Sequence, residues 1–100
     1  MIKIFNISGF DVKQGGYSRT GYHCVLLNKS SDYNQPLILL YDFYGNFKVS
    51  FTFNDVLTAI KKVNQNDEIS ISHVSLEDQI WFTTSQHEYF RLDIKNFTLL

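Results

Sequence analysis

The hydrophobic positions between residues 52 and 64 recur at the spacing of one face of an α-helix. They are Phe53, Val56, Leu57, Ile60 and Val63. Thr52, followed three residues later by Asp55, resembles a capping box, which marks the start of a helix. The pattern therefore predicts one amphipathic helix over residues 53–64. Because a helix of about twelve residues is only marginally stable alone in water, its apolar face must pack against the rest of the chain.

Three segments after this helix alternate between hydrophobic and polar residues, as half-buried β-strands do. They cover residues 68–74, 79–84 and 88–94, and their short connections favour antiparallel pairing. The face expected to lie toward the helix consists of Ile69, Ile71, Ile80, Phe82, Phe90, Leu92 and Ile94. The opposite face then carries Ser70, Ser72, Trp81, Thr83, Tyr89, Arg91 and Asp93.

Four further strands are expected before the helix. They cover residues 2–7, 22–28, 37–44 and 47–51, and Gly45-Asn46 between the last two is typical of a hairpin turn. Residues 37–44 are the most apolar of these segments and are a candidate for the centre of the sheet. Residues 8–21 contain four of the five glycines without a sustained period, so we expect a long loop there.

These elements predict an α+β domain covering residues 1–100, in which a single curled antiparallel sheet of about seven strands packs on one helix. The element order is ββββαβββ. One helix can cover only one face of such a sheet, so the other face would remain available to a partner. The unpaired backbone groups of an exposed edge strand could also pair with a second copy of the chain, forming a homodimer.

Composition and charge narrow the class of protein. Hydrophobic residues make up 44% of the chain, charged residues 19% and aromatic residues 16%, which favours a folded, sheet-rich domain over disorder. The formal net charge of −1 provides no general attraction to nucleic acid or to an anionic membrane. No run approaches the roughly 18 apolar residues of a membrane span. With one cysteine and no signal-peptide pattern, the protein is expected to be cytoplasmic.

No set of residues has the spacing of a catalytic or metal site. The three histidines show neither H-x-x-x-H nor H-x-H, and a lone cysteine cannot supply a multi-thiolate zinc site, so no metal or cofactor is expected. Residues 8–21 lack both glycine-rich phosphate motifs, G-x-x-x-x-G-K-[ST] and G-x-G-x-x-G. Cys24 could act as a nucleophile only with a base from elsewhere, because the adjacent His23 points to the opposite face of a strand. A buried, inert thiol is the simpler interpretation.

Two groups of residues are candidates for binding a partner protein. The expected loop carries Lys13, Tyr17 and Arg19, and the open sheet face carries Trp81, Tyr89 and Arg91. Tyrosine, tryptophan and arginine are enriched where binding energy concentrates in protein–protein interfaces. A second hypothesis is a nucleic-acid or nucleotide-binding domain that uses Lys13, Arg19, Tyr89 and Arg91, although the slightly acidic charge opposes it. A third is a thiol enzyme that uses Cys24.

In size, charge and α+β composition, the chain is similar to small stoichiometric inhibitors, such as bacterial immunity proteins and phage anti-defence proteins. This resemblance concerns the overall character of the chain and no particular motif. It implies a non-catalytic module that binds and blocks another protein. The many Asn, Lys, Ile, Phe and Tyr residues suggest an AT-rich coding sequence and hence a bacterial, phage or mobile-element origin. Such a protein-binding inhibitor is the leading hypothesis from the sequence.

Overall fold

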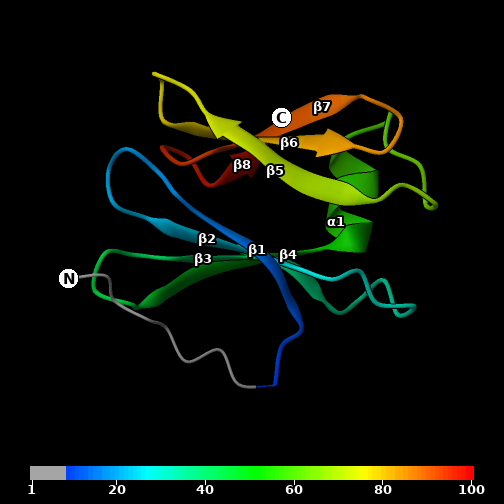
Figure 1. Ribbon diagram of the computed structural model, residues 1–100, viewed down its shortest axis with the longest axis horizontal. Coiled ribbons are helices and arrows are strands. Elements are labelled where there is room, and N and C mark those ends of the chain that lie inside the picture. Colours follow the sequence, from blue (N-terminus) through cyan, green and yellow to red (C-terminus); the bar gives the residue numbers. More distant parts are fainter. Residues whose placement is uncertain (1–8) are drawn as a thin grey trace.

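The computed structural model describes residues 9–100, which form two four-stranded antiparallel sheets and one short helix (Figure 1). The first sheet contains β1 (Val12–Tyr17), β2 (His23–Leu27), β3 (Pro36–Tyr41) and β4 (Phe47–Thr52), in that spatial order. Helix α1 (Phe53–Ala59) follows β4. The second sheet contains β5 (Ile69–Val74), β6 (Gln79–Thr84), β7 (Tyr89–Asp93) and β8 (Thr98–Leu99), again in chain order. The predicted α+β class and antiparallel pairing are confirmed.

The prediction of one curled sheet of about seven strands is wrong, because the strands form two separate sheets. Strands β4 and β5 are edge strands of different sheets, and α1 lies in the connection between them (Figure 1). The two inner faces share one core, formed by Cys24, Leu26, Ile38 and Leu40 on one side and Ile80, Phe82, Phe90 and Leu92 on the other. A helix of seven residues is too small to cover these faces, so the sheets bury them largely against each other.

The second sheet agrees closely with the alternation in the sequence. Strand β6 has the predicted bounds, and β5 begins one residue later than predicted. Strand β7 begins one residue later and ends one residue earlier than predicted. All seven residues expected on the inner face belong to the shared core or pack against it. Strand β8 was not predicted, because two residues are too few to carry a periodic pattern.

Strand β1 occupies much of the segment that was expected to be a loop, so that prediction is wrong over Val12–Tyr17. The strand pairs with β2 and places Gly15 opposite Val25 and Gly16 opposite Cys24. A glycine-rich strand pairs through its backbone and has no alternating side chains by which the sequence could reveal it. The strand predicted over residues 2–7 lies outside the described residues.

Side-chain hydrogen bonds join β1 to the edge of the second sheet. Lys13 Nζ donates to the carbonyl oxygen of Ile69 at 2.6 Å, and the Ile71 backbone N–H donates to Gln14 Oε1 at 2.7 Å. At the other end of β1, the backbone N–H of Arg19 donates to Asp78 Oδ1 at 2.6 Å. These bonds hold the β1 edge of the first sheet against the β5 edge of the second sheet.

The start of α1 was predicted correctly. The Asp55 N–H donates to Thr52 Oγ1 at 3.0 Å, and the Thr52 N–H donates to Asp55 Oδ2 at 2.8 Å, so both halves of the capping box are formed. The capping box accounts for two of the N–H groups that the first turn of a helix leaves without an internal partner.

The predicted end of the helix at residue 64 is wrong, because α1 ends at Ala59. Ile60 has an extended backbone (φ −118°, ψ 96°), and the Val63 N–H donates to the Ile60 carbonyl at 3.1 Å across a turn. Ile60 and Val63 are both buried. A turn therefore buries Ile60 and Val63 at the same three-residue spacing that the sequence pattern attributed to a helix.

Candidate interaction surface

Four side chains form a continuous cluster on the outer face of the second sheet. Trp81 on β6 pairs with His73 on β5 and with Arg91 on β7, and Tyr89 lies two residues before Arg91. The residues that flank Trp81 and Arg91 in the sequence, Ile80, Phe82, Phe90 and Leu92, belong to the core and are fully buried. We refer to His73, Trp81, Tyr89 and Arg91 as the Trp81 cluster.

A β-bulge brings His73 into this cluster. The register between β5 and β6 shifts between Ile71, which pairs with Phe82, and His73, which pairs with Trp81. Ser72 is therefore the extra residue on the bulged strand. Strict alternation would place His73 on the same side as Ile71, in the core, so sequence reasoning missed this residue. Nothing in the local sequence marks the bulge.

The indole ring of Trp81 is held between two side chains from opposite neighbouring strands. The His73 ring is nearly parallel to it, with an interplanar angle of 5° and 5.8 Å between the centroids. Arg91 Cζ lies over the ring, 5.2 Å from its centroid. Because β5 and β7 flank β6 on opposite sides, these two groups approach the indole from opposite neighbouring strands. The Tyr89 ring meets Trp81 edge to face at 6.5 Å.

Beside this cluster lies an open hollow of about 490 Å³, which we call the edge hollow. It is lined by Ala59, Ile60, Lys61, Lys62, Trp81, Tyr89, Arg91 and Leu100. Leu100 reaches it because its backbone N–H and carbonyl both pair with Arg91, which extends the β7–β8 pairing beyond Leu99. The hollow thus combines three cationic side chains with aromatic and aliphatic surface.

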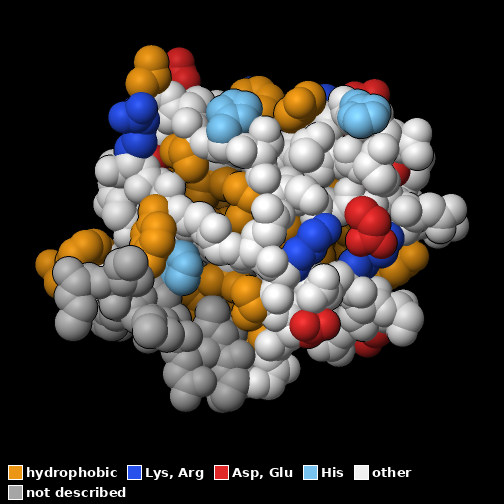
Figure 2. Space-filling model, viewed as in Figure 1, with side chains coloured by type: hydrophobic (Ala, Val, Ile, Leu, Met, Phe, Trp, Pro, Cys, Tyr) orange, Lys and Arg blue, Asp and Glu red, His pale blue; other side chains and the backbone are white. Residues whose placement is uncertain are grey.

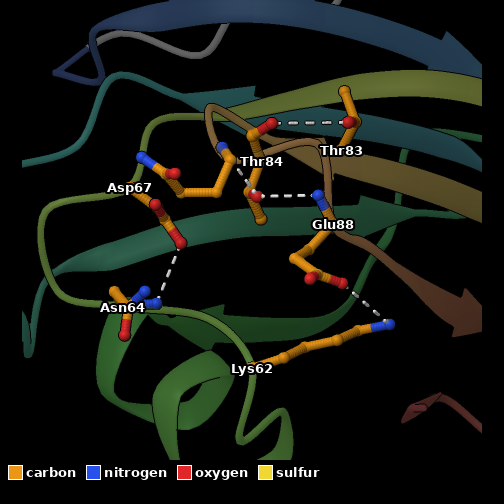
Figure 3. Close-up of polar contacts among 7 residues, drawn as sticks. Lys62, Asn64, Asp67, Thr83, Thr84 and Glu88 are labelled. Carbon is orange, nitrogen blue, oxygen red and sulfur yellow. Dashed lines mark hydrogen bonds and ion pairs between the residues drawn. The ribbon is translucent and has the colours of Figure 1, made fainter.

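Polar contacts fix the turn after α1 against the β6–β7 turn (Figure 3). Asp67, only 1% exposed, accepts a hydrogen bond from the Asn64 N–H at 2.9 Å and one from Ser85 Oγ at 3.4 Å. Lys62 Nζ lies 3.8 Å from Glu88 Oε2. Residues 61 and 62 are consequently held beside β7, where they form one wall of the edge hollow.

The six residues predicted to bind a partner fall into two groups. Trp81, Tyr89 and Arg91 lie together, whereas Lys13, Tyr17 and Arg19 lie on β1 and the following turn. Tyr17 is 52% exposed and stacks on the His23 ring at 4.7 Å, on the outer face of the first sheet. The Lys13 ammonium is hydrogen-bonded to the Ile69 carbonyl.

Cys24 is fully buried in the shared core, and this burial raises the pKa of its thiol to about 12. At neutral pH the thiolate, which is the nucleophilic form of cysteine, is therefore strongly disfavoured. The ring of His23 lies on the other face of β2, stacked on Tyr17, where it cannot accept the proton of this thiol. The environment of Cys24 is that of a core residue.

The charged side chains do not form an extended patch of one sign on the face shown in Figure 2, where Lys and Arg lie beside Asp and Glu. Within residues 9–100, no three His, Cys, Asp or Glu side chains are grouped as a metal ion would require. In the same part of the chain, no helix is both long enough and apolar enough to cross a membrane. Comparison with family models, curated proteins and solved structures gave no match.

Proposed function

We propose that this protein is a non-catalytic protein-binding domain that holds its partner through the Trp81 cluster. The observation that carries the proposal is the arrangement of Trp81 between His73 and Arg91 on the outer face of a sheet. Aromatic and arginine side chains supply much of the binding energy in protein interfaces. Side chains that neighbours already hold in place lose little conformational entropy when a partner binds.

The same arrangement favours a protein partner over a nucleic acid. Proteins that bind single-stranded nucleic acids stack bases on the open faces of aromatic rings. Here His73 and Arg91 already pack against the Trp81 ring, so less of that ring is open to a base. The exposed rings of the cluster are those of Tyr89, at 46%, and His73. The cationic residues of the nucleic-acid hypothesis also lie in two places, since Lys13 and Arg19 belong to the β1 side of the molecule.

We further propose that binding blocks the partner in a one-to-one complex, as the resemblance to small stoichiometric inhibitors implies. A surface built on paired strands keeps its shape on binding, which suits a domain that acts by occupying a partner's site. Analytical ultracentrifugation of the purified complex tests this stoichiometry directly.

Affinity capture with matched variants tests the surface. Tagged wild-type protein and the variants His73→Ala, Tyr89→Ala and Tyr17→Ala would be used as baits in a lysate of the cells that produce the protein, with quantitative mass spectrometry of the bound proteins. Tyr17→Ala is the control, because it removes a tyrosine of similar exposure from the other sheet. We expect one protein to be retained by wild type and Tyr17→Ala but depleted with the two cluster variants. Equal retention by all four baits would refute the proposal, provided that circular dichroism shows each variant to be folded.

A further inference from the structure

We infer that the edge hollow receives a carboxylate side chain from an acidic, partly apolar segment of the partner protein. This inference rests on the proposed function and names the chemistry of the partner. The hollow lies directly beside the Trp81 cluster and shares Trp81, Tyr89 and Arg91 with it. A partner that covers the cluster would therefore also cover the hollow.

The charge of the hollow favours an anionic group. Lys61, Lys62 and Arg91 all line it. Of these three, only Lys62 lies within ion-pair distance of an acidic side chain among the described residues, that of Glu88. Within residues 9–100, Lys61 and Arg91 thus have no acidic side chain within ion-pair distance. Because the Lys62–Glu88 pair is separated by 3.8 Å and lies at the surface, it neutralises Lys62 only in part.

Arg91 is suited to a carboxylate. The guanidinium is planar and always charged, and it can donate two parallel hydrogen bonds to the oxygens of a carboxylate. Its packing over the Trp81 ring fixes its orientation, so little rotamer freedom remains to be lost on binding. Cations in a concave site next to low-dielectric aromatic walls also concentrate the electrostatic field, which speeds the encounter with an acidic partner.

The apolar residues that line the edge hollow indicate what the ligand contains besides a carboxylate. Ala59, Tyr89 and Leu100 provide apolar surface within the same hollow, so an anion alone would leave part of it unfilled. Its volume of about 490 Å³ falls within the roughly 300–1,000 Å³ range of small-ligand sites. An acidic residue next to a leucine or a similar side chain matches both the charge and the apolar wall.

Nuclear magnetic resonance with defined peptides tests this inference. The probe is the capped peptide acetyl-Glu-Leu-Glu-Leu-amide at low ionic strength, and the matched neutral probe is acetyl-Gln-Leu-Gln-Leu-amide. The chain has one tryptophan, so its single indole N–H signal reports on Trp81. We expect saturable shifts in this signal and in the amides of residues 59–62 and 89–91, with at least tenfold weaker binding of the neutral peptide.

Two charge reversals localise the effect. Lys61→Glu should weaken binding of the acidic peptide at least tenfold. Lys95→Glu makes the same change in charge at an exposed lysine outside the hollow, and it should change binding by less than threefold. The inference is overturned if the acidic peptide causes no saturable shift, or if the two peptides bind equally well. It is also overturned if Lys61→Glu and Lys95→Glu lose peptide affinity to the same extent. Tighter binding of an oligothymidylate of eight nucleotides, reported by the same signals, would overturn it as well.

The result also separates this inference from the proposed function. If Tyr89→Ala loses the captured partner while Lys61→Glu retains it, the hollow does not contribute, and the Trp81 cluster remains the binding surface. If both variants retain the partner, the proposed function itself fails. Loss of the partner with both variants, but not with Lys95→Glu, supports both.

Discussion

The guanidinium of Arg91 lies over the indole ring of Trp81, with 5.2 Å between Cζ and the ring centroid. A cation over an aromatic ring is worth about 0.5–1 kcal/mol at exposed sites and about 2 kcal/mol when water is excluded. This contact therefore stabilises the outer face of the second sheet, and it also sets the position of the charge that we assign to partner binding.

A double-mutant cycle measures this contact. We expect Arg91→Met and Trp81→Leu to show a coupling of about 0.5–2 kcal/mol in the free energy of unfolding, since each variant alone removes the cation–ring contact. Urea unfolding followed by far-ultraviolet circular dichroism provides the four free energies. If the effects of the two substitutions on the free energy of unfolding are strictly additive, the contact between the two side chains does not stabilise the protein.

Replacement of Asp67 should loosen the wall of the edge hollow. Asp67→Ala removes the part-buried hydrogen bond that Asp67 accepts from the Asn64 N–H, and hydrogen bonds to charged groups contribute about 1.5–3 kcal/mol. We expect a loss of that size in urea unfolding. Glu68→Ala is the control, because this neighbouring acidic side chain is exposed and its removal should change stability by no more than about 0.5 kcal/mol. A loss of less than about 0.5 kcal/mol in Asp67→Ala would contradict the structural role of its carboxylate.

The buried thiol of Cys24 should make stability depend on pH under alkaline conditions. Burial raises the pKa of the folded thiol to about 12, whereas a thiol in an unfolded chain titrates near pH 8.5. Between these values the unfolded state loses its proton first. Stability attributable to Cys24 is therefore fully present below about pH 8.5 and decreases as pH rises, by about 1.4 kcal/mol for each pH unit.

Comparison of wild type with Cys24→Ala between pH 7 and pH 10 isolates this effect from the titration of lysines and tyrosines. The stability difference between the two proteins should shift in favour of Cys24→Ala as pH rises. Modification of the native thiol by a disulfide reagent should also be much slower than that of the unfolded chain. Parallel pH curves together with rapid native labelling would show that the thiol is accessible and ionises normally.

The alternation of residues in β5, β6 and β7 was sufficient to predict the strands and both faces of the second sheet. Ile80, Phe82, Phe90 and Leu92 point inward, so Trp81 and Arg91 between them must point outward. Candidate binding residues on regular strands could thus be identified from the sequence. His73 could not, because a bulge at Ser72 reverses its side of the sheet.

The features missed elsewhere depend on contacts between distant segments. Gly15 and Gly16 form a strand only because β2 offers a backbone partner, and a glycine pair otherwise indicates a loop. The turn at Ile60 preserves the burial that a longer helix would give, so the sequence pattern could not reveal where α1 ends. The helix predicted over residues 53–64 would include Lys61 and Lys62, whereas in the structure they lie beyond α1 and form a wall of the hollow beside β7.

Side-chain footprinting of the partner complex tests the central claim most directly. Hydroxyl radicals oxidise exposed aromatic side chains, and mass spectrometry locates the modified residues in the free and bound protein. We predict strong protection of Trp81 and Tyr89 in the complex and unchanged oxidation of Tyr17 on the other sheet. Protection of Tyr17 with unchanged oxidation of Trp81 and Tyr89 would contradict the assignment of the Trp81 cluster as the binding surface.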